Sequence, residues 1–543
     1  MVDYRLLDTG LLPAAANMAL DEVLARRAGQ GTSPPTLRFL RFSPDAALLG
    51  YHQEATRELR LDFCAANGID VNRRLTGGGA LLFQSSALGW ELVAPLGVAP
   101  FAGNFEAAVL AICEAAARAF ARLGLAARFR PRNDIEVDGR KISGTGGFVL
   151  DGGVLFQGTV LVKNEIERFL RALRVPVEKL KKREIESLMQ RLAFVEDLIG
   201  GPLDLAVLKK ALADEFAETF GLNLIPGELS AQERAELNER LDYYQSPEWV
   251  HLRTPLKDRP AWLRHILQTD NGTLRVHLWL DARGQRVQKA LISGDFFSQP
   301  QRFVFDLEAA LMGQKAEPAA LAQAVRDFMA SGRGRLEGIS VEEVAGAVAA
   351  AAARRALAPG FAEAEAADLF LVGLAPDQVA RTKAGWLLLP YCAKPVDCDW
   401  RYLPDCGRCG QCDYAAMYDL AQELGMEPVS IQSFEHLMEV LTDLAGRGGS
   451  FVGSCCEAFY CKHQRELETC GAAGVLVNLD STTCYDLGKG MDAYRGRFDN
   501  QTFMNISLIA KAARLMANGP AGDETGLAGA ADQTGAAGEG GRA

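Results

Sequence analysis

The sequence lacks any apolar run of the roughly 18 residues that a membrane-spanning helix needs. Its beginning, MVDYRLLDTG, lacks the basic and then apolar segments of a secretory signal. It also lacks an excess of basic residues, because 58 lysines and arginines face 69 acidic residues and give a net charge of −11. Nucleic-acid-binding surfaces are strongly basic, so this balance disfavours that class of partner. We expect a cytoplasmic protein that binds neither nucleic acid nor membrane.

Cysteine is scarce over most of the chain and crowded near its end. Only Cys64 and Cys113 precede residue 390, whereas the other ten of the 12 cysteines fall between Cys392 and Cys484. In a reducing compartment such crowding favours metal ligation over disulfide bonds. The chain is therefore expected to hold two different chemistries.

The length of 543 residues is too great for one hydrophobic core and predicts about three domains. Residues 1–225 alternate helical and extended patterns without a regular βαβ repeat, which predicts a mixed α/β (α+β) domain. Apolar spacing predicts helices at 16–29 and 104–124. The Asp-Gly pair within 134–144 predicts a hairpin.

A second unit, residues 226–360, is expected to follow the Pro-Gly pair at 226–227, which breaks the preceding pattern. Its first helix would be capped at Ser230. It would also contain the hairpin pattern of 273–297 and the alanine-rich helix of 344–358. These elements predict a small α/β domain.

The stretch RRLTGGGALLFQ, residues 73–84, places three glycines beside two arginines. A backbone without Cβ atoms lets a ligand approach main-chain amides, and successive N–H groups can bind an anion. An adjacent arginine adds bidentate phosphate recognition. The stretch is neither a P-loop nor a dinucleotide-binding glycine motif. Taken alone, it is equally compatible with a glycine-rich turn between two strands.

The segment NDIEVDGRKISGTGG, residues 133–147, puts Lys141 just after the expected hairpin turn and among glycines. A lysine fixed by strand geometry is suited to a phosphate or a developing oxyanion. An exposed hairpin lysine without function is the alternative that this segment alone leaves open.

Together, RRLTGGGAL and the later NDI and GRKISG segments resemble the lipoate–protein ligase family, of the biotin/lipoate ligase type. Three further segments occur in the expected order, namely NMALDEVL, LLGYHQ and LFQGTVL. YYQSPEWV and SGDFF resemble parts of that family's small accessory domain. The resemblance covers about residues 1–358 and implies a mixed-sheet, biotin/lipoate-ligase-like catalytic domain followed by a small α/β accessory domain.

The resemblance implies an ATP-dependent ligase that makes lipoyl-adenylate and pyrophosphate, then transfers the lipoyl group to a lysine of an acceptor protein domain. The implied cofactors are ATP and Mg²⁺, and the implied partners are lipoate, or a related acyl group, and the acceptor domain. Lys141 would act catalytically at the lipoyl carbonyl oxygen and the phosphate, and Asp134 would help at the magnesium ion or the acceptor amine. The residues implied to bind ATP or lipoyl-adenylate are Arg74, Thr76, Gly77, Gly78, Gly79, Ala80, Leu81, Leu82, Asp134 and Lys141.

The sequence departs from the family pattern at two pairs of residues. Phe83-Gln84 replaces a His-Asp pair, and Phe156-Gln157 stands where the family carries a histidine. Both departures leave the acyl group and the acceptor open. Octanoyl or lipoyl transfer without ATP, which uses a cysteine nucleophile, is one alternative, although Cys64 and Cys113 are expected in the core. Another is a redox or sulfur-handling iron–sulfur protein in which the ligase-like region only binds lipoyl groups.

The cysteine-rich unit, residues 370–518, is expected to be a small α/β metal-binding domain, and it resembles an uncharacterised domain appended to some lipoate ligases. The run C-x-x-C-x-x-C directs three thiolates at one centre, which predicts an iron–sulfur cluster or zinc. A purely structural zinc domain is the plainer alternative. The candidate ligands are Cys392, Cys398, Cys406, Cys409, Cys412, Cys455, Cys456, Cys461 and Cys484. The tail, residues 519–543, has little to bury and is expected to be disordered.

Overall fold

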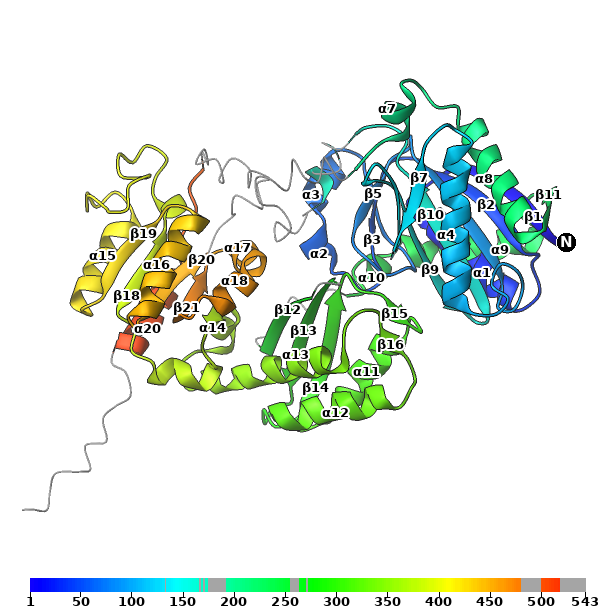
Figure 1. Ribbon diagram of the computed structural model, residues 1–543. Helices are drawn as coiled ribbons and strands as arrows, with labels where there is room; N and C mark the ends of the chain where they lie inside the picture. The colour runs from blue at the N-terminus through cyan, green and yellow to red at the C-terminus, as the bar shows by residue number, and fades with distance from the viewer. Residues whose placement is uncertain are drawn as a thin grey trace, which may run out of the picture.

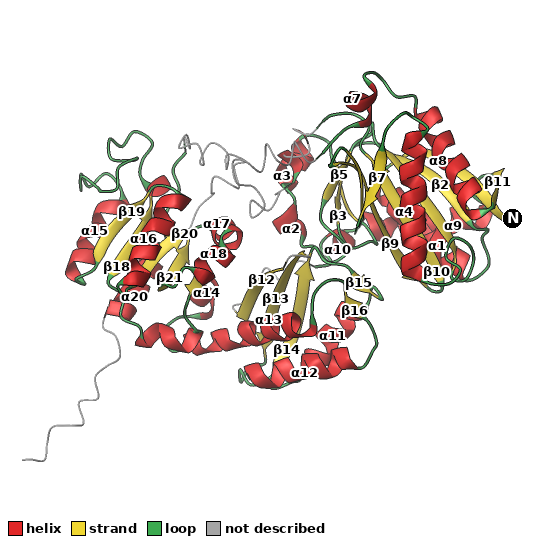
Figure 2. Ribbon diagram, in the orientation of Figure 1, coloured by secondary structure: helices red, strands yellow, loops and turns green. Residues whose placement is uncertain are grey.

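The computed structural model describes residues 1–131, 133–165, 168, 171–173, 192–253, 263–269, 272–479 and 500–517. Figure 1 shows three bodies that follow one another along the chain, and Figure 2 shows that each combines helices with a sheet. The largest sheets of these bodies have eight, three and five strands, in chain order. The mixed α/β class expected from the sequence is confirmed. The tail at 519–543 lies outside the described residues.

The first body is built on the eight-stranded sheet, in the order β11-β1-β2-β6-β10-β9-β8-β7. Strand β1 runs parallel to both of its neighbours, and the remaining pairs are antiparallel. Its strands are β1 (Val2–Leu12), β2 (Thr36–Phe42), β6 (Leu88–Pro95), β7 (Ala127–Arg130), β8 (Asp134–Val137), β9 (Arg140–Leu150), β10 (Gly153–Val160) and β11 (Leu222–Pro226). The predicted hairpin is confirmed, with Asp138 and Gly139 in the left-handed conformation at its turn.

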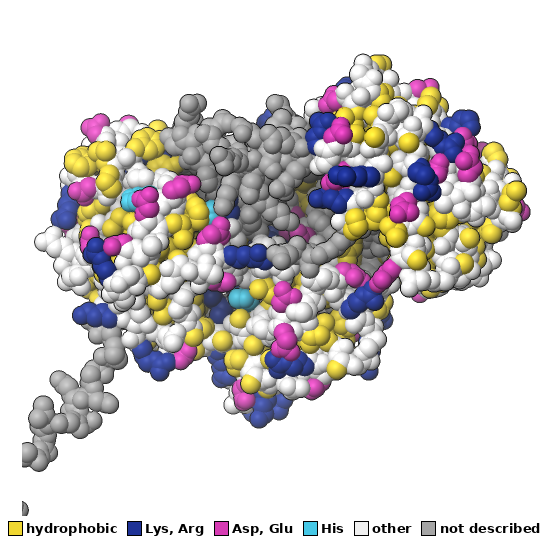
Figure 3. Space-filling view, viewed as in Figure 1, with side chains coloured by type: hydrophobic (Ala, Val, Ile, Leu, Met, Phe, Trp, Pro, Cys, Tyr) yellow, Lys and Arg dark blue, Asp and Glu magenta, His cyan; other side chains and the backbone are white. Residues whose placement is uncertain are grey.

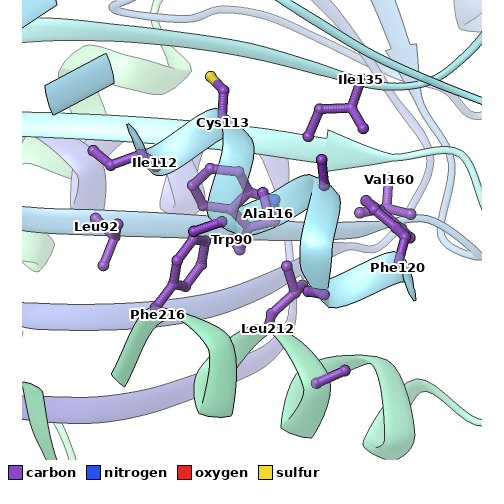
Figure 4. Close-up of a cluster of buried hydrophobic side chains, with 14 of the residues drawn as sticks. Trp90, Leu92, Ile112, Cys113, Ala116, Phe120, Ile135, Val160, Leu212 and Phe216 are labelled. Atoms are coloured by element: carbon purple, nitrogen blue, oxygen red, sulfur yellow. The ribbon is translucent and has the colours of Figure 1, made fainter. Parts of the chain in front are cut away.

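Helices cover both faces of this sheet and bury one core on each. The principal helices are α1 (Ala14–Gly29), α4 (Phe105–Ala121), α8 (Leu205–Phe220) and α9 (Ala231–Gln245), and the shorter ones are α2 (Ala55–Glu58), α3 (Leu61–Ala66), α7 (Val195–Ile199) and α10 (Pro247–Val250). On the α4–α8 face, the Trp90 ring packs 5.0 Å from that of Phe216, centroid to centroid, beside Cys113 (Figure 4). The predicted helices at 16–29 and 104–124 are α1 and α4.

Helix α9 has the N-cap predicted at Ser230, in a capping box with Glu233. It packs against α1, and Tyr244 near its end lies in the core on that face of the first sheet. The segment that the sequence assigned to the start of the second unit therefore packs with the first body.

A small sheet stands beside the large one and carries the glycine segment. It is formed by β3 (Ala46–Leu49), β4 (Asp70–Arg73) and β5 (Leu81–Phe83), with β3 in the middle. β3 is parallel to β4 and antiparallel to β5. The glycines lie in the connection from β4 to β5, so both of its ends are fixed by pairing to one central strand.

The second body has a three-stranded antiparallel sheet with helices packed on it. Its strands are β12 (Leu263–Thr269), β13 (Gly272–Leu280), β14 (Val287–Gly294) and the short pair β15 (Ser298–Gln299) and β16 (Arg335–Leu336). Its helices are α11 (Phe303–Leu311), α12 (Pro318–Ala330) and α13 (Val341–Ala353), followed by the short η2 (Arg354–Leu357). The predicted hairpin and alanine-rich helix are confirmed.

The third body has a sheet in the order β17-β21-β20-β18-β19, in which only β17 is antiparallel to its neighbour. Its strands are β17 (Leu369–Val372), β18 (Trp386–Pro390), β19 (Glu427–Ile431), β20 (Ser450–Cys455) and β21 (Ala473–Asn478). Its helices are α14 (Glu363–Ala367), η3 (Pro376–Arg381), η4 (Tyr391–Ala393), α15 (Asp413–Glu423), α16 (Phe434–Gly446), α17 (Glu457–Lys462), α18 (Gln464–Thr469) and α20 (Ile506–Ala517).

The three bodies meet at one partly buried carboxylate. Glu457, the first residue of α17, forms ion pairs with Arg57 of α2 and with Arg264 of β12, the latter at 3.3 Å. Burial alone would raise the pKa of Glu457, but these guanidinium groups hold that pKa well below its usual range. The junction therefore joins an element from each body through ion pairs that are partly shielded from water.

Basic and acidic side chains are intermixed on the face shown in Figure 3. That face has no single-signed field, so attraction of a charged ligand has to come from local groups. Among the described residues, no helix has the length and apolar character to cross a membrane.

Candidate active site

A cavity of about 490 Å³ lies where the glycine segment, β9, β10 and the β12–β14 sheet come together. All of the residues that the sequence analysis assigned to nucleotide or adenylate binding line it, except Asp134. Asp134 is one contact away, because its carboxylate pairs with Lys141. The structure therefore brings segments 73–84 and 133–147 to one cavity.

Arg74 stabilises the glycine segment through hydrogen bonds from its guanidinium group. Its guanidinium Nη2 donates hydrogen bonds to the carbonyl oxygens of Gly77, at 2.8 Å, and Gly79, at 2.7 Å. Nε donates to Thr76 Oγ1 at 2.9 Å and Nη1 to the Leu48 carbonyl at 3.1 Å. The sequence assigned Arg74 to the ligand, but each nitrogen of this buried guanidinium is already bonded to the protein. In the structure these bonds hold the loop, and because Arg74 also lines the cavity, its assignment to the ligand stays a prediction.

The loop that Arg74 holds offers main-chain donors to the cavity. The N–H groups of Gly77, Gly79 and Ala80 have no hydrogen-bond partner within the described part of the chain. A Cβ placed on Gly79 would have nothing within 4 Å. Amides without partners beside open space can receive an anion.

Lys141 supplies a cation at the edge of the same cavity. Its ammonium lies 2.6 Å from Asp134 Oδ1, and its side chain is 32% exposed. The other oxygen of Asp134 accepts from Arg130 at 2.8 Å. A Cβ on Gly144 would come within 2.8 Å of Lys141 Nζ, so this glycine makes room for the ammonium. The two cations neutralise Asp134, and the ammonium is still able to face an incoming anion.

The second body closes one side of the cavity with Phe297. Its ring lies against the glycine loop, since a Cβ on Gly78 would come within 2.9 Å of Phe297 Cζ. The Gly78 amide donates to the Phe296 carbonyl at 3.3 Å, and Gln301 Nε2 donates to the Leu75 carbonyl at 2.6 Å. The glycines therefore serve close packing between two bodies as well as the cavity. The SGDFF segment was the only sequence signal for Phe297.

Both departures from the family pattern have partners at the cavity. Gln157 Nε2 donates to Thr76 Oγ1 at 3.3 Å. Gln84 Nε2 donates to the backbone oxygen and to the carboxylate of Glu165, each at 3.1 Å. Glu165 also lines the cavity, and nothing in the sequence pattern singled it out. The glutamines thus orient polar groups at the positions where the family carries histidine or aspartate.

A narrow apolar chamber of about 20 Å³ adjoins the main cavity. Arg74, Leu81 and Gln157 line both spaces. The chamber's wall is otherwise mostly apolar and includes Leu40 and Trp90. At this volume the chamber has room for about one water molecule, so an aliphatic chain could enter only if its walls moved apart.

No thiol of the described residues lines the main cavity, and the only cysteines before residue 390 are Cys64 and Cys113. Both are fully buried, and burial raises the pKa of each thiol to about 11. Cys113 lies on α4 in Figure 4, and its Sγ is 3.6 Å from Oγ1 of Thr145, a residue that lines the cavity. Thiols in this state are poor nucleophiles. The expectation that both lie in the core is confirmed.

Of the candidate metal ligands of the third body, Cys392 follows β18, Cys455 and Cys456 stand at the end of β20, and Cys461 lies in α17. The others before residue 480 lie in the segment between β18 and α15, namely Cys398, Cys406, Cys409 and Cys412. Among the described residues, no three cysteine, histidine or carboxylate side chains are grouped closely enough to hold a metal ion. Cys484, another candidate, lies outside the described residues.

Comparison with known proteins matches residues 13–217 to the lipoyl protein ligase A/B catalytic domain. An octanoyltransferase LipM from Kyrpidia tusciae is 30% identical over 271 residues, which cover 46% of this chain and 98% of that protein. Lipoate-protein ligase LplJ of Bacillus subtilis is 26% identical, over 56% of this chain and 88% of that protein.

Among solved structures, the similar proteins include a bi-partite lipoate protein ligase from Thermoplasma acidophilum and a lipoate-protein ligase A bound with ATP. The first is 27% identical, with a TM-score of 0.42, and covers 47% of this chain and 100% of that one. The second is 26% identical, with a TM-score of 0.41, and covers 46% and 99%. The match to the catalytic-domain family ends at residue 217 and does not extend to the cysteine-rich unit.

Proposed function

Because the chain belongs to the lipoyl protein ligase A/B family, whose relatives act in lipoyl and octanoyl transfer, we propose that it is an ATP-dependent lipoate–protein ligase. In the first step, the lipoate carboxylate attacks the α-phosphorus of ATP, giving lipoyl-adenylate and pyrophosphate. In the second, an acceptor lysine amine attacks the acyl carbon, giving the amide and AMP. The acceptor is a lipoyl domain of another protein.

The observation that carries this proposal is that the described residues lining the cavity include groups that bind anions and include no cysteine. Adenylation brings a carboxylate to a polyphosphate, so the site needs donors and cations. The free amides of the glycine loop and the Lys141 ammonium are such groups. A transferase working through a cysteine needs a reactive thiol in the cavity, and neither Cys64 nor Cys113 is there.

Each group in the cavity then has one task. The loop amides hold phosphate oxygens, and Arg74 acts through the loop by fixing those amides. Lys141 neutralises charge on the α-phosphate and the acyl oxygen as the anhydride forms. The aliphatic part of the acyl group extends toward the chamber beside Trp90, which has to widen to admit it.

Magnesium would be held by carboxylates that face the cavity. Glu165 and Asp295 line it, and their carboxylates also accept hydrogen bonds from Gln84 and from the Thr273 amide, respectively. Asp134 does not line the cavity, and its oxygens pair with Lys141 and Arg130. Hard cations such as Mg²⁺ prefer oxygen ligands, so Glu165 and Asp295 fit this ion. It would offset the negative charge of the nucleotide phosphates. Asp134 positions the lysine ammonium and is not assigned to the metal.

Transfer of an octanoyl group without ATP remains the second candidate, because several curated relatives are octanoyltransferases LipM. A redox protein that only binds lipoyl groups is less favoured, since simple binding does not need anion donors at the acyl end. The cysteines of the third body keep their predicted role as iron–sulfur or zinc ligands, and they have no step in the reaction proposed.

A comparison of acyl donors tests the proposal. The full chain is supplied with a lipoyl acceptor domain and either lipoate with Mg-ATP or octanoyl groups on a carrier-protein thioester. We expect ATP-dependent lipoylation, also in a Cys64→Ser/Cys113→Ser double variant that retains the native fold. Transfer from the thioester without ATP, abolished in the double variant, would contradict the proposal.

A further inference from the structure

Residues 50–58 run from the end of β3 into helix α2, and their first part lies against the glycine loop. A Cβ on Gly50 would come within 1.9 Å of the Gly78 carbonyl oxygen, so this close approach requires glycine. The Tyr51 amide donates a hydrogen bond to the Thr76 carbonyl oxygen at 2.9 Å. The backbone that presents the loop amides to the cavity therefore rests on the start of this segment.

Hydrogen bonds make the start of this segment rigid. Gln53 is 1% exposed, and its Oε1 accepts from the Gly50 amide at 2.8 Å. Arg73 Nη1 donates to the carbonyl oxygens of Gly50 and Tyr51, each at 2.9 Å. Buried polar networks whose groups are paired in this way rigidify the backbone that they join. The position of α2 is therefore passed on to the glycine loop.

Helix α2 lies where the three bodies meet (Figure 1), and the other two bodies hold it by ion pairs. Arg57 pairs with Glu457 of the third body, and Glu58 pairs with Arg275 of the second body at 3.1 Å. A helix of four residues has little stability of its own, so these contacts fix its position. On the side of the third body, the Glu457 amide donates to Asn478 Oδ1 at 3.1 Å, at the end of β21.

None of the described residues that line the cavity belongs to the third body. Its influence on the cavity therefore has to pass through residues of the other bodies. The path through Arg57 is short, because seven residues separate it from Gly50 at the glycine loop.

We propose that Arg57 is a positioning residue for the nucleotide site, and that the third body, through Glu457, holds the glycine loop in the conformation that binds ATP. The identity of the ligand rests on the proposed function, whereas the link from Glu457 to the loop rests on the contacts alone. Arg57 does not line the cavity and acts through the loop. The cysteine-rich body is then part of what shapes the ligase site.

Hydrogen exchange tests the link without any substrate. The full chain is compared with Arg57→Gln and Glu457→Gln, at a temperature below the first unfolding transition of each variant. Arg27→Gln is the matched control, because Arg27 pairs with Glu236 at 2.5 Å inside the first body and does not line the cavity.

Amide exchange follows local opening, so we expect the backbone of 50–58 and of 73–84 to exchange about tenfold faster in both junction variants. The control should exchange at the wild-type rate in these two segments. Faster exchange that is confined to the third body, with 73–84 unchanged, would overturn the inference. So would equal acceleration of 73–84 in Arg27→Gln.

The affinity for Mg-ATP, measured by titration calorimetry on the same proteins, gives the functional readout. We expect Kd to rise about tenfold in Arg57→Gln and in Glu457→Gln, and to stay unchanged in the control. The double variant should bind no more weakly than Glu457→Gln alone, because both substitutions break one ion pair. At saturating ATP, kcat for lipoate-dependent pyrophosphate release should stay within about twofold of wild type, since Arg57 touches no reacting atom.

An unchanged Kd in both junction variants would overturn the inference, as would fully additive effects in the double variant. Failure of the wild-type chain to bind ATP would instead contradict the ligase proposal. The two failures are distinguishable, because the exchange of 73–84 is measured without ATP or lipoate.

Discussion

The Lys141 ammonium lies 2.6 Å from the Asp134 carboxylate, within the hairpin that β8 and β9 form. Arg130 holds the other oxygen of that carboxylate. Asp134 therefore fixes the orientation of the Lys141 side chain, and the charge of Asp134 is neutralised by both Lys141 and Arg130. Such preorganisation lets a cation stabilise developing negative charge without first paying reorientation entropy.

Replacing Lys141 by alanine should lower the rate of adenylate formation about 10²–10³-fold, as the loss of one preorganised donor does at other active sites. Lys209→Ala is the matched control, because Lys209 pairs with Asp8 at the same 2.6 Å but outside the cavity. The measurement is lipoate-dependent pyrophosphate release under saturating ATP. Equal rates for the two variants would show that Lys141 has no role in chemistry.

Two adjacent glycines should respond differently to alanine. Gly78 has φ +88°, and its Cβ would come within 2.9 Å of Phe297 Cζ, so Gly78→Ala should lose more than about 1 kcal/mol of unfolding free energy. Gly79→Ala meets no protein atom within 4 Å and should keep its stability within about 0.5 kcal/mol. It should nonetheless raise KM for ATP, because the methyl enters ligand space. Calorimetry measures the stability of both variants, and steady-state kinetics measures their KM for ATP. An unchanged KM for Gly79→Ala would contradict the assignment of the loop to the nucleotide site.

The Glu457 junction should couple the unfolding of the three bodies. Glu457→Gln removes the charge that pairs with Arg57 and Arg264, and because these side chains are partly exposed the cost should stay below the roughly 3–5 kcal/mol of a fully buried pair. We expect the third body to unfold in a separate, earlier calorimetric transition. Glu435→Gln is the control, since Glu435 is exposed in the first turn of α16 in the same body. A single unshifted transition for Glu457→Gln would contradict this view of the junction.

Acid should weaken the first body through Glu233. Burial alone would raise the pKa of this carboxyl, but hydrogen bonds from Arg5, the Ser230 amide and Ser33 lower it to about 2. A depressed folded-state pKa gives stability that is present above the usual value of 4.5 and is lost as pH falls toward 2. This shift corresponds to about 3 kcal/mol. Unfolding free energy measured between pH 5 and about 2 should fall less steeply in Glu233→Gln; identical slopes would refute the assignment.

Much of the local structure could be predicted because its signals are local. The Asp138-Gly139 turn, the Ser230 cap and the helical spacing of α4 each depend on a few neighbouring residues. The pairing of β1 with β11, more than 200 residues later, could not be predicted, since no local pattern specifies a distant strand partner. For the same reason the packing of α9 on α1 could not be predicted.

The candidate site also has parts that could be predicted from the sequence and parts that could not. The glycine and lysine segments could be identified from residue type and spacing, and the structure puts both at one cavity. The contacts of Arg74 with the loop could not be predicted, because a guanidinium suits phosphate and carbonyl oxygens alike and only the folded loop shows the carbonyl groups beside it. Glu165 and Phe297 could not be predicted as residues of the site, because they are far in sequence from residues 73–84 and contact that segment only in the folded chain.

The most direct test of the central claim is isotope exchange between ATP and labelled pyrophosphate, catalysed by the purified full chain. Exchange requires reversible formation of an acyl-adenylate and does not depend on which acceptor domain is used. We predict exchange that requires lipoate and is nearly abolished in Lys141→Ala but preserved in Lys209→Ala. Absence of lipoate-dependent exchange in the folded wild-type chain, together with acyl transfer from a carrier thioester, would contradict the account.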